Sequence, residues 1–299
     1  MSSLGIAIPT YNRQEQLESL LETIPEHIPT YISDNGSCLT ESFRKKFPQA
    51  RVSAVTGNII TMFENWNRAA RLVSQDWIII PSDDDIYYPQ SFETVSQYLD
   101  RYAQADMIVF GHNVVDENYR IIGRWVPKTL DDLSTPSGFK HFKYGVDARM
   151  PSIIFRRSLL EAIGFFDEEF MVTAADSYMI QRASLLGRTV FVPLIISGYR
   201  VWTQGTTHGT ISTQAWLKEI VQWGDKLEQQ LKKVPMYASE IGHIRSEIYA
   251  RNLHAGLSHL RNKGFHLKAV RHFLAADFPW QATLLTRMKL IYQLIKFRM

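Results

Sequence analysis

The chain of 299 residues is long enough for one large core, or for one core and a smaller appended unit. Its composition, 45% hydrophobic and 21% charged, is that of an ordinary soluble globular protein and excludes a disordered or low-complexity chain. The single cysteine, Cys38, excludes an internal disulfide and fits a reducing cytoplasm. We expect neither a secretory signal nor a membrane span, since no basic segment precedes an apolar run and no apolar run reaches about 18 residues.

The net charge of +3 is unevenly distributed. From Arg261 to the C-terminus there are eight Lys and Arg residues and one acid, Asp277, so this tail carries +7 and the preceding 260 residues carry −4. A basic tail on a mildly acidic body suggests an anionic partner, such as membrane lipid, a phosphorylated acceptor or nucleic acid. A solvated helical face explains the same charges equally well.

The first half of the chain alternates predicted strands and helices. Short apolar runs predict strands at residues 4–9, 31–33, 52–55, 77–80 and 107–110. Helices are predicted at residues 62–73 and 89–101, and before Pro25, where four apolar residues share one face: Leu17, Leu20, Leu21 and Ile24. Strands that alternate with helices in this way favour a parallel α/β sheet.

The middle of the chain is less regular. Residues 112–126 predict a hairpin, residues 130–145 a loop over the site, and residues 151–155 and 189–192 strands. Helices are predicted at residues 156–163, ending at Gly164, and at residues 176–186. From about Thr213 the sequence is helical, and one apolar stripe indicates core packing against the sheet: Trp216, Ile220, Trp223 and Leu227.

Three adjacent carboxylates, Asp83, Asp84 and Asp85, follow the predicted strand at residues 77–80. Crowded carboxylates repel one another, and a divalent cation that prefers oxygen ligands, Mg²⁺ or Mn²⁺, would remove the conflict. The carboxyl end of a parallel strand is also where open α/β sheets bind ligands. The alternative is an acidic loop that caps the helix beginning near Pro89, and we favour the metal site.

Polar groups also end two other predicted strands on the same side of the sheet. The carboxylate of Asp34 can accept hydrogen bonds from a base or from ribose hydroxyls, although in isolation a plain Asx turn is the simpler explanation. The first strand ends in Pro9, Thr10, Tyr11, Asn12 and Arg13. Three polar strand ends at one edge predict a ligand-binding crevice.

A second acidic region lies further along the chain. Residues 167–169 are interpreted as a solvated turn. Asp176 differs because it begins an amphipathic helix. It is either a helix N-cap or a carboxylate that the helix dipole keeps ionised and available as a base.

Together these segments resemble the family 2 glycosyltransferases, which share the GT-A fold. The matching segments are residues 8–13, 33–37, 76–85 and 164–168, with Asp176 downstream, in the family's order and spacing across residues 4 to 205. The resemblance implies a Rossmann-like α/β fold with a mostly parallel sheet flanked by helices. This GT-A domain would span residues 1–210, followed by a helical C-terminal region at residues 211–299.

The resemblance also implies a role for each site residue. The nucleotide site would comprise Pro9, Thr10, Tyr11, Asn12, Arg13, Asp34, Asp83, Asp84 and Arg200. The family's DXD-type element would be residues 83–85, and the metal ligands would be Asp84, Asp85 and His208. Asp176 would match the catalytic base of inverting members.

Two positions depart from the family pattern. Leu39 stands where a further acid is usual, and Ala175 replaces the acid that usually precedes the base. The triple Asp also leaves the metal ligand ambiguous between Asp84 and Asp85.

The expected activity is metal-assisted, inverting transfer of a sugar from a nucleoside-diphosphate sugar, with uridine as the preferred base, to a hydroxyl of a glycan or lipid-linked acceptor. One alternative is a nucleotidyltransferase, although such enzymes usually carry a glycine-rich phosphate loop and residues 9–13 contain no glycine. Another is a non-catalytic module that binds sugar nucleotides or polysaccharides. Retention of both the triple Asp and Asp176 argues against that module.

The C-terminal residues predict an amphipathic helix. Between residues 282 and 299 one face carries Leu284, Leu285, Met288, Ile291, Tyr292, Ile295 and Met299, flanked by Arg287, Lys289, Lys296 and Arg298. This pattern predicts peripheral contact with the inner face of the cell membrane, in an otherwise cytoplasmic protein. The opposite face carries Leu290, Leu294 and Phe297, so the helix could instead pack on protein. Nucleic acid is not expected as a partner.

Overall fold

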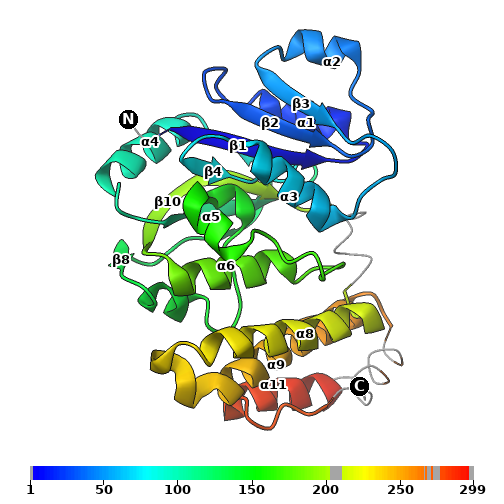
Figure 1. Cartoon of the computed structure of the whole chain (residues 1–299). Helices are drawn as coiled ribbons and strands as arrows, with labels where there is room; N and C mark the ends of the chain where they lie inside the picture. Colours follow the sequence, from blue (N-terminus) through cyan, green and yellow to red (C-terminus); the bar gives the residue numbers. More distant parts are fainter. Residues whose placement is uncertain (1–2, 203–210, 266, 268–270, 272–276, 296–299) are drawn as a thin grey trace. The chain divides into compact units, whose positions relative to one another are not determined.

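The structure is a computed structural model of the chain, and it describes residues 3–202, 211–265, 267, 271 and 277–295. Two compact units alternate along the sequence (Figure 1). Unit 1 consists of Met1–Lys140, Asp147–Glu169 and Met179–Trp202, and unit 2 of His141–Val146, Phe170–Tyr178 and Thr203–Met299. The sequence predicted one boundary near residue 210, and the third segment of unit 2 begins at Thr203. Two short earlier segments, which the sequence did not assign to a second unit, also belong to unit 2.

Unit 1 is built on one mixed sheet to which ten strands of the described chain contribute, in the order β3-β2-β1-β4-β9-β6-β10-β5, with β7 on β6 and β8 on β10. The strands are β1 (Leu4–Thr10), β2 (Thr30–Asp34), β3 (Ala50–Ala54), β4 (Trp77–Ile79), β5 (Ile86–Tyr87), β6 (Met107–Val115), β7 (Ile121–Trp125), β8 (Asp131–Leu133), β9 (Ile153–Arg156) and β10 (Thr189–Arg200). The predicted α/β fold class is confirmed.

The half of the sheet made by β3, β2, β1 and β4 is parallel. Every residue of β1 and β2 is buried, as expected of strands covered on both faces. A further parallel pair is β6 with β10, and β9 lies antiparallel between β4 and β6. The carboxyl ends of β1, β2 and β3 therefore lie side by side at one edge.

The helices of unit 1 include those predicted from the sequence and one short helix, α2, that was not predicted. They are α1 (Gln14–Leu21), α2 (Glu41–Lys46), α3 (Met62–Leu72), α4 (Ser91–Arg101) and α5 (Arg157–Ile163), while α6 (Ala175–Leu186) begins in unit 2 and ends in unit 1. Thr61 and Glu64 form a capping box that starts α3. Gly164 ends α5 with φ of +77°, a conformation that glycine adopts without strain.

Three helices form most of unit 2: α8 (Gln214–Leu231), α9 (Ile241–Asn262) and α11 (Leu284–Ile295), with short 3₁₀ turns elsewhere at Ser137–His141, Met150–Ser152 and Pro235–Glu240. The stripe Trp216, Ile220, Trp223 and Leu227 is buried, and within the unit α8 packs on α9. Leu290 of α11 is buried against α9 in a cluster with Leu253 and Leu257. No helix within the described ranges is long and apolar enough to span a bilayer.

Candidate active site

The polar segments that the sequence singled out meet at the carboxyl edge of the parallel strands. In the sheet register Thr10 stands beside Asp34, and Asp34 beside Ala54. The segment after β4 reaches the same edge, because Thr10 Oγ1 donates a hydrogen bond of 2.8 Å to Asp83 Oδ2. The ends of β1, β2 and β4 thus form one site, as expected from their order in the sheet.

Arg13 neutralises part of the carboxylate cluster. Its Nη2 donates to Asp84 and lies 3.3 Å from Asp83 Oδ1. Burial opposes the charge on Arg13, but the charges of Asp83 and Asp84 outweigh burial and raise the pKa of the guanidinium. Arg13 therefore remains a cation that holds two of the three carboxylates at the end of β1.

The carboxylates themselves are strongly buried. Burial raises the pKa of Asp83 to about 7, against the lowering effect of Arg13. Burial, with the negative charge of Asp84 added, raises the pKa of Asp85 well above its ordinary value. Asp85 Oδ2 accepts a hydrogen bond of 2.8 Å from the Ser82 backbone N–H. Burial thus disfavours the ionised forms of Asp83 and Asp85, as is common for carboxylates at functional sites, and a nearby cation would favour those forms.

Arg200 adjoins the cluster from the end of β10. Its backbone N–H donates to Asp85 Oδ1 over 3.4 Å, and its side chain donates to the Glu117 carbonyl and to Tyr119 Oη. The guanidinium lies 4.3 Å from the ring centroids of both Tyr119 and Trp202. Arg200 Nε and Trp202 Nε1 are buried and have no hydrogen-bond partner in the described part of the chain. The sequence did not single out Tyr119 or Trp202, because isolated aromatic residues carry no motif.

The turn after β2 is joined to the end of β1. Asn12 adopts φ of +55° and directs its side chain at Gly36, where a Cβ atom would stand 2.1 Å from Asn12 Oδ1. Asp34 is fully buried and accepts hydrogen bonds from Leu39 N–H and Cys38 Sγ, neither of which is the bond two residues on that defines an Asx turn. Pro9 lies inside β1, whereas Tyr11 just beyond it is 46% exposed. Of these residues, Tyr11 presents the largest surface to a ligand.

Two polar residues of α3 hold these strand ends in place, and sequence patterns did not reveal them. Asn65 accepts from Ser33 Oγ and donates to the Thr10 carbonyl, which links β2 to β1. Arg68 donates to Ser33 Oγ, to both Ser53 Oγ and its carbonyl, and to the Ala54 carbonyl, over 2.7 to 2.9 Å. A single helix thus fastens the carboxyl ends of β1, β2 and β3.

Comparison with known proteins identifies this arrangement. The sequence model described as "Glycosyl transferase family 2" matches residues 5–164, more than half of the chain. The chain belongs to glycosyltransferase family 2. The resemblance inferred from the motifs is confirmed. The search of curated proteins found no match to the chain.

Solved structures agree with this family 2 glycosyltransferase in fold. TarS 1-349 of S. aureus in complex with UDP-GlcNAc is 14% identical with a TM-score of 0.63, covering 99% of this chain and 90% of that chain. Mannosyltransferase PcManGT from Pyrobaculum calidifontis in complex with GDP-Man and Mn²⁺ is 15% identical with a TM-score of 0.53, covering 99% and 86%. Identities this low establish the shared fold and no more.

The carboxylates of the glycosyltransferase can be tested for their fit to a divalent cation. The two other aspartates of the cluster both act on Asp85 as negative charges. Within the described ranges no three metal-ligating side chains are grouped closely enough to hold an ion by themselves. Mg²⁺ is usually bound by one or two carboxylates, with substrate phosphates and water completing its shell. The donor set fits an ion of that kind.

The predicted base, Asp176, lies outside unit 1. Asp176 is in the first turn of α6, on the part of that helix that belongs to unit 2, and its Oδ1 accepts a hydrogen bond of 2.6 Å from Ser177 N–H. Just before it, Glu219 of α8 accepts the backbone N–H groups of residues 171–173. These three hydrogen bonds to one buried carboxylate fix the backbone of residues 171–173, the segment that precedes α6 and Asp176. His208 lies outside the described residues.

Proposed function

We propose that this family 2 glycosyltransferase is an inverting, metal-assisted enzyme that moves a sugar from a nucleoside-diphosphate sugar to a hydroxyl of a glycan or lipid-linked acceptor. The observation that carries the proposal is the carboxylate cluster of Asp83, Asp84 and Asp85, buried beside Arg13 at the carboxyl end of β4. Nucleotide sugars are the ligands in the TarS and PcManGT complexes, UDP-GlcNAc in one and GDP-Man in the other. We propose a uridine diphosphate sugar as the donor.

In the proposed reaction the acceptor hydroxyl attacks the anomeric carbon as the bond from that carbon to the diphosphate oxygen breaks. The hydroxyl proton passes to the Asp176 carboxylate, and the electron pair of the broken bond leaves with the nucleoside diphosphate. A base is needed because a hydroxyl is a poor nucleophile at neutral pH. Attack opposite the leaving group inverts the anomeric centre.

The other residues bind and orient the donor. Tyr11 would hold the nucleoside at the ends of β1 and β2, together with Pro9, which lies within β1, and the turn that Asp34 fixes. Arg13 keeps Asp83 and Asp84 in place, and Arg200 donates its backbone N–H to Asp85 and carries a buried Nε that has no hydrogen-bond partner among the described residues. A Mg²⁺ or Mn²⁺ ion held by Asp84 and Asp85 would stabilise the negative charge of the diphosphate.

The donor proposal is tested by thermal unfolding of the full chain with nucleotide sugars, each with and without Mn²⁺. A ligand at 100 times its Kd raises the free energy of unfolding by about 2.7 kcal/mol, so we expect a clear upward shift with a UDP-sugar. Tyr11→Ala should weaken this shift, because it removes the exposed ring at the end of β1. Tyr292→Ala, a similarly exposed tyrosine on α11, is the matched control. No shift with any nucleotide sugar would contradict the proposal.

We propose in addition that α11 contacts an anionic membrane, which would concentrate a lipid-linked acceptor near the enzyme. Its apolar stripe of Leu284, Leu285, Met288, Ile291 and Tyr292 is between 45% and 66% exposed. The opposite face buries Leu290 and Gln293. The packed face is thus the one that carries Leu290, while the longer stripe faces water. Large exposed apolar patches mark interaction sites, and Lys289 beside this one suits an anionic surface.

Loss of the stripe should abolish vesicle binding without harming the fold. We expect Leu285→Ser/Met288→Ser to lose co-sedimentation with phosphatidylglycerol vesicles at low salt, while its unfolding temperature stays unchanged. Ile121→Ser/Ile122→Ser, an equally exposed apolar pair on β7, is the control and should bind as the unaltered chain does. Point changes are preferable to deleting α11, which would uncover the apolar face of α9. If the unaltered chain does not co-sediment, α11 has no membrane role.

A further inference from the structure

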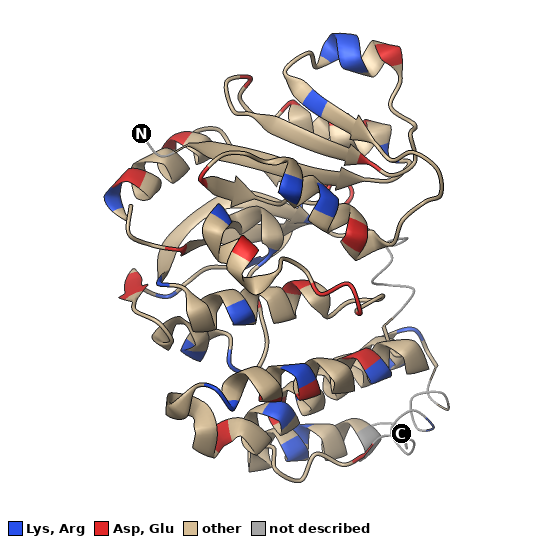
Figure 2. Cartoon of the chain, in the orientation of Figure 1, with Lys and Arg blue, Asp and Glu red and all other residues tan. Residues whose placement is uncertain are grey.

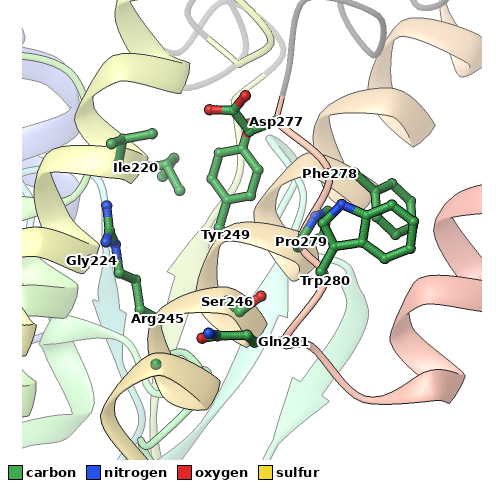
Figure 3. Close-up of a pocket in the computed structure, with 12 residues that line it drawn as sticks. Ile220, Gly224, Arg245, Ser246, Tyr249, Asp277, Phe278, Pro279, Trp280 and Gln281 are labelled. Atoms are coloured by element: carbon green, nitrogen blue, oxygen red, sulfur yellow. The ribbon is translucent and has the colours of Figure 1, made fainter.

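A pocket of about 320 Å³ lies within unit 2, between α8, α9 and residues 277–281 (Figure 3). Ile220 and Val221 of α8 and Tyr249 of α9 supply its apolar surface, and Phe278 and Trp280 form the wall on the other side. Small-molecule sites measure about 300 to 1,000 Å³, so the pocket suits a ligand at the small end of that range. None of these residues belongs to the nucleotide site proposed above.

The wall of the pocket presents an aromatic surface to solvent. The side chain of Trp280 is 73% exposed, and its ring lies 4.6 Å from that of Phe278 at an interplanar angle of 58°. Leaving a tryptophan largely in water forgoes the stabilisation that its burial would give. An aromatic face beside a pocket is the kind of surface on which a flat, partly apolar ligand stacks.

The polar groups of the pocket favour a ligand without net charge. Arg245 is already paired with Asp225 over 2.5 Å and with Glu228 over 3.6 Å. Asp277 is the other charged residue in the lining, so the lining holds one acid and one base and has no net charge. Figure 2 shows the same mixture of signs along α8 and α9. A phosphate or nucleotide would find the one cation of the lining already paired with two carboxylates, whereas a neutral hydroxyl would find both donors and acceptors.

Two glycines allow the polar side chains to stand where they do. A Cβ atom at Gly224 in the middle of α8 would lie 3.1 Å from Arg245 Cγ, and one at Gly242 in the first turn of α9 would lie 2.4 Å from Gln281 Oε1. Glycine inside a helix is unfavourable relative to alanine. The helices therefore give up intrinsic stability at positions that admit a guanidinium and an amide to the pocket lining.

We propose that this pocket binds a neutral saccharide, with one sugar ring stacked on Trp280 and its hydroxyls bonded to Arg245, Ser246, Asp277 and Gln281. A sugar ring combines an apolar C–H face with an edge of hydroxyls, which matches an aromatic wall beside polar side chains. Carboxylate, guanidinium and amide groups can each contact two neighbouring hydroxyls. That the saccharide is part of the glycan acceptor rests on the proposed transferase function. The binding itself does not.

The test measures saccharide binding to the full chain by saturation-transfer NMR. The probes are neutral di- and trisaccharides of glucose, mannose and N-acetylglucosamine, with UDP as a separate probe of the nucleotide site. We expect Trp280→Ala to weaken saccharide binding about tenfold or more, with Trp280→Phe recovering most of the loss. Ser246→Phe should abolish binding by filling the pocket while Trp280 stays intact. Met236→Ala, an exposed apolar residue of unit 2 outside the pocket, is the control.

The outcomes separate this inference from the proposed function. If UDP binds but no saccharide does, or if Trp280→Ala and Ser246→Phe bind saccharide as the unaltered chain does, the pocket is not a saccharide site and the transferase proposal stands. If saccharide binds and both variants lose it, but no nucleotide binds, the pocket assignment holds and the transferase proposal fails. An unchanged unfolding temperature and an unchanged circular dichroism spectrum of both variants would show that each has folded.

Discussion

We expect the double variant Asp84→Asn/Asp85→Asn to lose sugar transfer by at least about 100-fold, the scale on which removal of charge-stabilising groups acts in other enzymes. The two carboxylates are the oxygen ligands that Mn²⁺ or Mg²⁺ would share with the diphosphate. Asparagine keeps the shape of each side chain and an oxygen that can accept the Ser82 N–H, so the fold should persist. The measurements are turnover with excess Mn²⁺ and the Mn²⁺-dependent rise in unfolding temperature with UDP.

A second pair of neighbouring aspartates provides the control. Asp131 and Asp132 of β8 belong to the same unit and lie outside the strand-end cluster, and Asp132 pairs with Arg188 at the surface. Asp131→Asn/Asp132→Asn should leave turnover within a few-fold of normal, since surface ion pairs contribute little. Full activity of the unaltered enzyme in excess EDTA would overturn the metal assignment.

The second large effect is expected at Asp176. Asp176→Asn should fold and still bind UDP, but transfer should fall by about 10²- to 10⁴-fold, the usual contribution of a positioned base. Asparagine retains an oxygen for the Ser177 N–H, so the start of α6 is preserved while the basicity is removed. Single-turnover transfer and UDP affinity, measured on the same preparation, separate loss of chemistry from loss of binding.

Asp167→Asn is the matched control for that experiment. Asp167 accepts the Glu169 N–H in an exposed turn, just as Asp176 accepts the N–H of a neighbouring residue, and it should tolerate the change. If Asp176→Asn retains activity within a few-fold and Asp167→Asn does not, the base belongs to the acidic turn, where Glu168 is the next residue to test.

The alternating pattern of the chain predicted most of the fold, because five strands of the first half, β1, β2, β3, β4 and β6, are apolar runs bounded by turns. The two-residue strand β5 was not predicted. The apolar faces of α1 and α8, the C-terminal glycine of α5 and the hairpin of β6 and β7 follow from local rules of the same kind. The antiparallel insertion of β9 does not, since the four residues of Ile153–Arg156 carry no signal of strand direction. Direction in a sheet is decided by connections made elsewhere in the chain.

The site was predictable in its location but not in its pairings. The motifs predicted that Thr10, Arg13 and Asp83 lie at one edge of the sheet. They did not predict that Arg13 pairs with Asp84, because these residues are 71 positions apart and no local pattern relates them. The position of Asp34 at a strand end predicted a ligand contact. In the structure its two carboxylate oxygens accept hydrogen bonds from Cys38 Sγ and Leu39 N–H, in the turn that follows it. The sequence did not predict a role for Arg68, because an arginine in an amphipathic helix is ordinarily exposed to solvent. Its partners, Ser33 and Ser53, come together only through the pairing of β2 with β3.

The hydrogen bonds of Arg68 have a consequence for engineering. This guanidinium, with Asn65 one turn earlier in α3, fastens the strand ends through two serine hydroxyls and three backbone carbonyls. These contacts hold the spacing of the strand ends apart from the loops that follow them. Because α3 holds the ends of β1, β2 and β3, we expect that the loops after these strands can be exchanged without displacing the strands. Residues 35–40 and 55–60 could then be replaced by segments from other family members to change the preferred nucleobase, provided that the Asn35 contacts with Ile60 are rebuilt.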